Sequence, residues 1–332
     1  MISLAGLSPE RHYTNTVDRS YDAAGRLTAE TLSMDGTTWE VGYGYDAGGR
    51  QTQVVYPDDR VLDRGFTSRN QLASLTFDGH AHATLTYDAG GRETRRVLGN
   101  GIIEHREWTA ANRMERVYAE QAGIVDFTYA YDLNQRKTLE QDGVLGAWSQ
   151  SFAYDAEDRL ADWNRGVVVN GAIASPLATQ SWNLTLVGDW DDTTRDGVLE
   201  DRTHNDVHEI TAINGAGMQH DVKGNLTVDP LSGQTYAWDE ENRLTAAEDG
   251  GSTVLGTYRY DALGRRVQKT VDGVARTFVM AGAQVVSEYV AGVLDRSYVY
   301  GAYVDEPVCV VLADDSELFY HRNHLYCASG QA

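Results

Sequence analysis

Residues 258–273 read YRYDALGRRVQKTVDG, and this stretch contains the signals that decide the fold. The aromatic residues Tyr258 and Tyr260 are separated by one polar residue. This is the period of two expected for a β-strand with one buried face. The letters DALGR over 261–265 predict a turn, because an Asp carboxylate accepts hydrogen bonds from turn N–H groups and Gly adopts positive φ without strain. A second strand then ends at Asp272-Gly273, and Asp-Gly is the strongest short signal for a β-hairpin.

The same phrase returns along most of the chain. Between Tyr21 and Tyr154 its copies follow one another at steps of 21 to 24 residues. Degenerate copies start at Phe66, Trp108, His204, His220 and Trp238, and Asp-Gly or Asn-Gly dipeptides fall between many of the copies. We assign as structural anchors of the repeat Tyr21, Asp22, Tyr45, Asp46, Tyr87, Asp88, Tyr131, Asp132, Tyr154, Asp155, Trp238, Asp239, Tyr260 and Asp261. Each repeat therefore predicts a strand, a Tyr-Asp turn, a return strand and an Asp-Gly turn.

The repeat indicates an all-β fold with very little helix. A two-stranded hairpin is marginally stable by itself, so consecutive antiparallel hairpins are expected to lie side by side in one long twisted, curled sheet. In each anchor the aromatic ring is expected to pack against adjacent hairpins, and the Asp to cap its turn. The Arg that follows is expected to donate hydrogen bonds to a neighbouring carboxylate or carbonyl.

We expect one domain with three parts. Residues 1–20 are an atypical lead-in, and residues 21–300 form the repeat array, with an irregular insertion over 165–203. Residues 301–332 break from the repeat.

Composition excludes several classes of function. The net charge of −21 argues against a nucleic-acid or anionic-membrane surface, because phosphate would be repelled. The first residues have neither a basic region nor a full apolar core, so no signal peptide is expected on this chain, and no stretch is apolar enough to span a membrane. Two cysteines give no disulfide framework, and whether Cys309 and Cys327 pair is left open.

No catalytic, cofactor-binding or metal-binding residue is assigned. His321 and His324 are a weak metal signal without a third ligand, and the acidic run from Asp189 to Gly197 lacks the Gly that an EF-hand requires. Glycoside hydrolysis needs a pair of carboxylates at a suitable distance. Among 49 acidic residues some pair will always meet that condition, so such a pair carries almost no weight as evidence. The aromatic rows suit sugar stacking as well as core packing, and packing is the favoured interpretation.

The Tyr-Asp phrases at this step resemble the YD/RHS repeat family, over roughly residues 13–326. The phrase around Tyr320, His321, His324 and Leu325 is similar to the opening of the family's RHS-associated core region, truncated here. The resemblance implies a sheet wound into a hollow shell that encloses a toxin or similar polypeptide. The family's self-cleavage phrase has no counterpart in this sequence, so no cleavage residue is carried over. About ten repeats are fewer than a closed shell should need, which predicts an open, C-shaped sheet.

The preferred hypothesis is a non-catalytic shell segment. It would enclose or present a polypeptide cargo, or pair with the remainder of an RHS shell, in a secreted or surface-displayed toxin system. The alternative is a module that binds carbohydrate or protein with its aromatic sheet face. A carbohydrate-active enzyme is the third and least favoured hypothesis.

Overall fold

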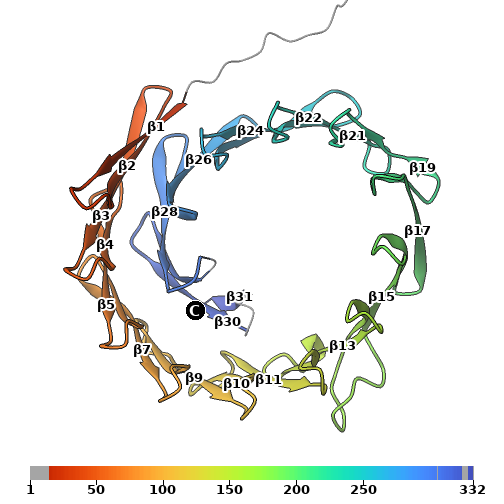
Figure 1. The fold of residues 1–332 in the computed structure, drawn as a ribbon, viewed down its shortest axis with the longest axis horizontal. Helices are drawn as coiled ribbons and strands as arrows, with labels where there is room; N and C mark the ends of the chain where they lie inside the picture. The colour runs from red at the N-terminus through yellow and green to blue at the C-terminus, as the bar shows by residue number, and fades with distance from the viewer. Residues whose placement is uncertain (1–14, 305, 324–327, 332) are drawn as a thin grey trace, which may run out of the picture.

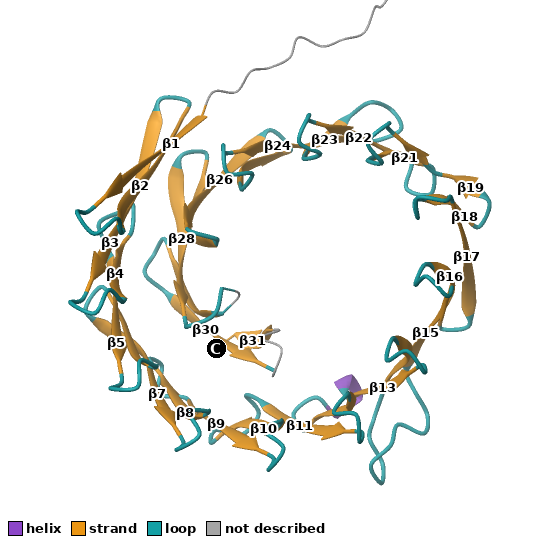
Figure 2. Ribbon diagram, viewed as in Figure 1, coloured by secondary structure: helices purple, strands orange, loops and turns teal. Residues whose placement is uncertain are grey.

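The structure, a computed structural model, describes residues 15–304, 306–323 and 328–331. Within these residues it contains strands and a single short 3-10 turn, Gly146–Trp148, as Figure 2 shows. The predicted all-β class with very little helix is therefore confirmed. Most of the predicted lead-in lies outside the described residues, and its end belongs to the first strand.

The strands fall into two hydrogen-bonded sheets of 19 and 12 strands. The first sheet contains β1 (Asn15–Tyr21), β2 (Leu27–Met34), β3 (Thr37–Tyr45), β4 (Gln51–Val55), β5 (Val61–Phe66), β6 (Leu72–Phe77), β7 (His80–Tyr87), β8 (Glu93–Leu98), β9 (Ile103–Trp108), β10 (Met114–Ala119), β11 (Asp126–Tyr131), β12 (Lys137–Asp142), β13 (Gln150–Tyr154), β14 (Leu160–Arg165), β15 (Ala178–Leu184), β16 (Trp190–Arg195), β17 (Val198–His204), β18 (Ile210–Ile213) and β19 (Ala216–Gly217). The second contains β20 (Gln219–His220), β21 (Leu226–Asp229), β22 (Gln234–Trp238), β23 (Leu244–Glu248), β24 (Val254–Tyr260), β25 (Arg266–Val271), β26 (Val274–Ala281), β27 (Gln284–Val290), β28 (Val293–Tyr300), β29 (Pro307–Leu312), β30 (Glu317–Arg322) and β31 (Ala328–Gln331).

Within each sheet every strand pairs antiparallel with the next strand of the chain, as consecutive hairpins require. The two sheets meet at Met218, whose backbone N–H still donates to the carbonyl of Thr211 at 2.9 Å. The strip of strands is therefore continuous along the chain, although its ladder is interrupted once.

The strip curls through a full turn and then overlaps itself (Figure 1). Its last strands lie inside the ring formed by its first strands, with β26 packed on β3 and β29 packed on β7. One turn therefore takes 22 or 23 strands. At about 4.8 Å per strand, the circumference is about 110 Å and the diameter between backbones about 35 Å.

The sheet is open, as expected, but it is not C-shaped. No hydrogen bonds between the two ends of the described sheet close it, yet these ends do not face one another across an opening. They overlap and share the main hydrophobic core of the described residues, which joins Trp39, Val41 and Leu75 of the outer layer to Val299, Cys309 and Phe319 of the inner layer. We call this overlap of β2–β9 with β25–β30 the seam.

The turns separate onto two rims of the ring, because successive hairpin turns lie on opposite edges of a sheet. The Tyr-Asp turns, such as those that begin at Asp22 and Asp46, form one rim, which we call the YD rim. The Asp-Gly and Asn-Gly turns form the opposite rim, the DG rim. Over the predicted insertion, residues 166–177 are a long loop on the DG rim, whereas β15–β17 continue the ordinary hairpin pattern. The proposed domain boundaries therefore stay a prediction.

Candidate functional site: the repeat anchors and the seam

Each Tyr-Asp anchor forms a turn of the same geometry. In the first, the backbone N–H of Asp22 donates to the carbonyl of Arg26 at 2.9 Å, and Gly25 donates back to the carbonyl of Asp22 at 3.0 Å. One oxygen of the Asp22 carboxylate accepts from the backbone N–H groups of Ala24 and Arg26, both at 2.9 Å. The other oxygen accepts from Nε of Arg26 at 2.7 Å. The carboxylate and the guanidinium thus hold the two ends of the turn together.

These hydrogen bonds also explain the acidity of the anchor carboxylates. The backbone and side-chain hydrogen bonds of Arg26 hold the pKa of Asp22 below its ordinary value, and Arg50 and Arg92 do the same for Asp46 and Asp88. The same hydrogen bond recurs at Asp132, Asp155, Asp239 and Asp261, where the carboxylate accepts from Nε of the following Arg at 2.7 Å in each case.

The anchors also bind each repeat to the one before it. The hydroxyl of Tyr45 donates to the carbonyl of Leu27 at 2.8 Å, while the guanidinium of Arg26 lies 4.9 Å from the centre of the Tyr45 ring. The same Arg26 donates to the carbonyl of Asp46 at 3.3 Å. Equivalent hydrogen bonds from the aromatic side chain to a carbonyl of the preceding repeat are made by Tyr87, Trp108, Tyr131, Tyr154, Trp238 and Tyr260. Tyr21, in the first described strand, is instead 57% exposed.

The turn position before the Arg has positive φ in every anchor, and Gly25 sits there at +76°. A Cβ at Gly25 would meet nothing within 4 Å, so only the backbone conformation opposes a side chain. We expect Gly25→Val to destabilise the protein by about 1 kcal/mol or more, since β-branched residues disfavour this region. Gly25→Asn is the matched control and should be milder, because Asn70, Asn112 and Asn242 occupy the same turn position with φ of 61–65°. Equal melting temperatures for the Val variant and the unmodified chain would contradict the assignment.

The seam is crossed by polar contacts between residues more than 200 positions apart. The hydroxyl of Tyr56 donates to the carbonyl of Tyr298 at 2.6 Å, and Arg60 donates to the hydroxyl of Ser297 at 2.9 Å. Farther along, Arg265 and Glu30 form an ion pair at 2.7 Å, and Arg259 pairs with Asp35. The inner layer is therefore fixed to the outer one along its length and not at a single point.

A buried cluster of charges lies where β8 and β9 meet the inner layer. Arg96 and Glu306 pair at 2.5 Å across the seam, and both side chains are 3% exposed. Glu104 contacts His321 at 2.8 Å and Arg106 at 3.2 Å. Although burial alone would raise it, the pKa of Glu104 is lowered to about 2, because His321, Arg106 and Arg96 stabilise the carboxylate. Burial also lowers the pKa of Arg322 to about 10.

One residue of the phrase that resembles the opening of the RHS-associated core region, His321, belongs to this cluster. His321, on β30, is 1% exposed and lies against Glu104 of the outer layer. His324 and Leu325 lie outside the described residues, so the arrangement of the full phrase is not tested. The hydrogen bond of His321 to a carboxylate joins the two layers.

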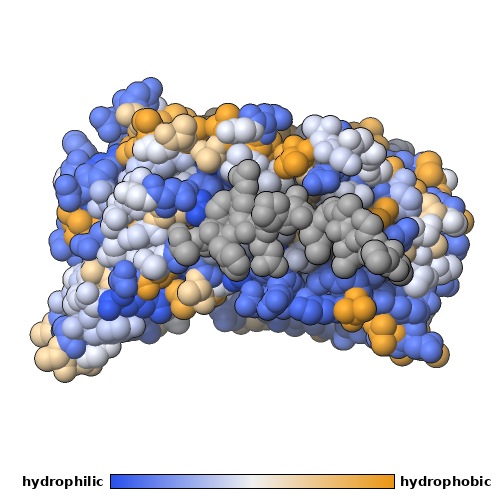
Figure 3. Space-filling view, turned by 90° about the horizontal axis from the view of Figure 1, so that it is seen from above, coloured by the Kyte–Doolittle hydropathy of each residue, from blue (hydrophilic) through white to orange (hydrophobic). Residues whose placement is uncertain are grey.

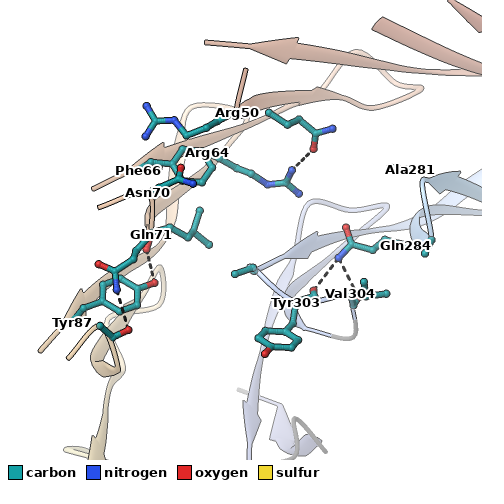
Figure 4. Close-up of a pocket in the computed structure, with 16 residues that line it drawn as sticks. Arg50, Arg64, Phe66, Asn70, Gln71, Tyr87, Ala281, Gln284, Tyr303 and Val304 are labelled. Atoms are coloured by element: carbon teal, nitrogen blue, oxygen red, sulfur yellow. Dashed lines mark hydrogen bonds between the residues drawn. The ribbon is translucent and has the colours of Figure 1, made fainter. Parts of the chain in front are cut away.

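A cavity of about 610 Å³ opens between the two layers on the YD rim (Figure 4). Arg64, Phe66 and Tyr87 line its outer wall, and Gln284 and Tyr303 face them from the inner layer. Burial lowers the pKa of Arg64, whose guanidinium donates to the side-chain oxygen of Gln51. The cavity thus presents a partly desolvated cation, which suits a ligand with hydrogen-bond acceptors.

Other candidate groups from the sequence are not brought together. Asp189 contacts His208 of a neighbouring hairpin at 2.9 Å, and Asp192 accepts from Asn183 at 3.1 Å, so two carboxylates of this acidic run are engaged with nearby side chains. In the described part of the chain its carboxylates do not gather into a group that could hold a metal. No helix among the described residues has the length and apolar character needed to span a membrane. The face seen in Figure 3 is largely hydrophilic, with hydrophobic residues in scattered groups.

Comparison with known proteins connects this geometry to one family. Residues 21–61 and 238–277 match the family model described as RHS Repeat. The tRNA3(Ser)-specific nuclease WapA of Bacillus spizizenii is 30% identical over 137 residues, 40% of this chain and 6% of that protein. The tRNA nuclease WapA of Bacillus subtilis (strain 168) is 34% identical over 101 residues, 29% of this chain and 4% of that protein. The matched region is thus a small part of these relatives.

Solved structures show the same fold. A crystal structure of TcdB2-TccC3-Cdc42 superposes with a TM-score of 0.75 at 13% identity, covering 94% of this chain and 19% of that one. A crystal structure of TcdB2-TccC3 without its hypervariable C-terminal region gives a TM-score of 0.67 at 12% identity, again over 94% of this chain and 19% of that one. Nearly the whole strip, including its curvature, therefore corresponds to part of a much longer chain.

Proposed function

This chain is an RHS-repeat protein, and we propose that it forms one turn of a shell wall around a polypeptide, without itself catalysing a reaction. The observation that carries the proposal is the seam: the strip makes a complete turn and is held in that turn by a hydrophobic core and buried ion pairs. The resemblance of the repeats to shell-forming relatives supports the same role. A secreted or surface-displayed system is part of the proposal, and it rests on the family alone.

The size of the ring indicates what kind of polypeptide it would surround. With about 35 Å between opposite backbones and side chains projecting about 5 Å from each wall, about 25 Å remains open, and less where the inner layer lies. A helix is about 10–12 Å wide and passes through such an opening. A folded domain of about 100 residues, with a radius of gyration of about 13 Å, does not. We propose that the enclosed segment is unfolded or helical.

The YD rim is the place where we propose that further shell wall adds. Leu133, Leu186 and Val222 occupy the tips of three turns on this rim, and each is 99% exposed or more. Fully exposed aliphatic side chains in several turns of one rim are suited to contact with another wall. A single ring is open on both sides, so further wall would cover the parts of the polypeptide that extend beyond this ring.

The other two hypotheses have less support. Apart from Tyr21, which is 57% exposed, the anchor aromatics have their polar atoms in hydrogen bonds, and several rings are covered by Arg. These rings are therefore used within the wall and not offered to a sugar. The nuclease activity in the names of the Bacillus relatives belongs to proteins of which this chain covers 6% or less. We therefore propose neither carbohydrate binding nor a nuclease activity for it.

A protease-protection experiment tests the proposal. The chain would be co-expressed with the polypeptide encoded next to it in the same gene or operon, purified, and treated with a protease. We expect that polypeptide to be cut much more slowly in the presence of the ring than alone. The matched control is the Phe319→Ala variant discussed below, which should loosen the ring and restore cleavage. Cleavage at the same rate with and without the unmodified chain would refute enclosure.

A further inference from the structure

Three potential metal ligands meet inside the seam, near the DG rim. A ring nitrogen of His82, the thiol of Cys309 and a carboxylate oxygen of Glu317 lie within 4.8 Å of one another. His82 belongs to β7 of the outer layer, whereas Cys309 and Glu317 belong to β29 and β30 of the inner layer. His82 is 1% exposed and Cys309 is 0% exposed. Glu317 is about one-third exposed and lies at the entrance.

A β-bulge explains why a polar ring points into this core. Thr76 pairs with Ala81 and Leu75 pairs with Ala83, so His82 is an extra residue without a partner in the register. Bulges re-aim side chains, and here two successive residues, His82 and Ala83, are both buried. The carbonyl of His82 accepts from the backbone N–H of Gly99 at 3.0 Å, which fixes the bulge.

The hydrogen bonds of His82 leave one nitrogen facing the cluster. Its Nδ1 lies 2.9 Å from the carbonyl of His80, and because a carbonyl only accepts, Nδ1 must carry a proton. Its Nε2 has no hydrogen-bond partner among the described residues, although an oxygen of Glu317 lies 3.1 Å away. In the neutral ring, Nε2 and this oxygen are both acceptors, so a cation between them would resolve the contact. A metal-bound His commonly donates its other N–H to a carbonyl in this way.

We infer that His82, Cys309 and Glu317 form a binding site for a zinc-like transition-metal ion that joins the two layers of the ring. One nitrogen, one sulfur and one carboxylate oxygen are a ligand set that Zn²⁺ accepts, with a water in the fourth position. Bond lengths of about 2.0–2.3 Å place tetrahedral ligands about 3.3–3.8 Å apart, so ligand atoms that are now up to 4.8 Å apart must approach one another by up to about 1.5 Å. Glu317 is the ligand with room to move, since it lies at the entrance of the site.

Binding would release a proton and stabilise the seam. The thiol of Cys309 must give its proton to the solvent when its sulfur binds the ion, so affinity should increase with pH. Burial raises the pKa of this thiol to about 12, which disfavours a thiolate in the absence of the ion. Because the ligands come from both layers, the ion would bind the overlapped ring and not the open strip. The inference does not depend on what the ring encloses.

Titration of the metal-free protein with Co²⁺ tests the site, because a Co²⁺–thiolate bond absorbs in the near ultraviolet. We expect one equivalent to bind with this absorption, and Zn²⁺ to displace it and raise the melting temperature. Cys309→Val keeps the packing and should abolish the absorption. Glu317→Gln, at a partly exposed position, should keep the fold and weaken Co²⁺ binding by about tenfold or more.

Two matched controls make the result specific. Glu120→Gln alters a carboxylate that also lies beside a histidine, 2.7 Å from Nε2 of His105, and should leave Co²⁺ binding unchanged. Cys327→Ser changes the other cysteine of the chain and should also have no effect. An absence of thiolate absorption in the unmodified protein, or its persistence in Cys309→Val, would overturn the inference. A circular-dichroism spectrum of each variant distinguishes loss of a ligand from loss of the fold.

Discussion

Phe319→Ala is expected to lower the free energy of unfolding by about 3–5 kcal/mol, the usual cost of removing a buried aromatic side chain. Phe319 lies on β30 with 1% of its surface exposed and belongs to the core that joins the two layers. Its ring centre is 5.8 Å from that of His82 in the outer layer. Its Cζ is so close to Gly99 that a Cβ there would come within 2.9 Å of it. The space left by Phe319 therefore cannot be refilled without moving both layers.

The loss should also have a structural signature. Because Phe319 packs between the layers, the variant should expose the inner strands to protease before the rest of the strip unfolds. Leu133→Ala is the control, since Leu133 is 99% exposed and its removal should change stability by no more than about 0.5 kcal/mol. Urea unfolding followed by circular dichroism, together with limited proteolysis, measures both effects. Equal losses in the two variants would mean that Phe319 is not in the core.

Glu104→Gln is expected to cost about 3–5 kcal/mol, because it removes one member of a buried group of charges and leaves the others uncompensated. The carboxylate of Glu104 contacts His321 of the inner layer and Arg106 of its own layer, and it is 2% exposed. Glu120→Gln makes the same chemical change at an exposed partner of His105, where about 0–1 kcal/mol is expected. Similar urea midpoints for the two variants would show that the cluster is solvated.

The dependence of stability on pH is a second test of the contribution of Glu104. The folded pKa of Glu104, about 2, lies below the value of about 4.3 for an unfolded chain. The ionised carboxylate is thus favoured by folding, so its contribution is complete above about pH 5 and is lost as the pH falls toward 2. The pKa of Glu306 is lowered as well, mainly by Arg96 against the effect of burial. The unmodified protein should therefore lose stability more steeply than Glu104→Gln over this range.

The local structure was predictable because it depends on residues that are neighbours in the sequence of each repeat. The Asp-x-x-Gly-Arg turn depends on hydrogen bonds among five neighbouring residues, as at Asp22 and Arg26, and the period of two determines which side of a strand is buried. The hydrogen bond from the Tyr45 hydroxyl to Leu27 was not predicted, although the choice of Tyr or Trp, with a polar group at the ring's edge, was a signal for it.

The seam was not predictable in the same way. Whether the strip overlaps depends on a small curvature per strand that accumulates over 22 or 23 strands, and no local pattern specifies that angle. Arg96, Glu104 and Glu306 occur among other charged residues and look like exposed positions. One signal was present: the run VCVV over 308–311 breaks the alternation of the repeats, as expected for a strand buried on both faces.

The group around His82 also required the structure. His82 is separated from Cys309 and Glu317 by more than 220 positions in the sequence, so no spacing rule connects it to them. The bulge that turns His82 inward depends on an unequal pairing of β6 and β7, and alternation alone would not place His82 and Ala83 on the same side.

A zero-length cross-link across the seam tests the central claim, that the two ends of the strip overlap. Arg259 of β24 pairs with Asp35, in the turn after β2, so in an Arg259→Lys variant a carbodiimide should join the new amine to the Asp35 carboxylate. The pair Lys137 and Glu140, 2.7 Å apart within one strand, is the internal control. Mass spectrometry should find one cross-linked peptide that connects residues 35 and 259, with a mass lower by one water molecule than the sum of its two parts. If the control pair reacts in the folded variant and the connection between 35 and 259 does not form, the two ends of the strip do not overlap.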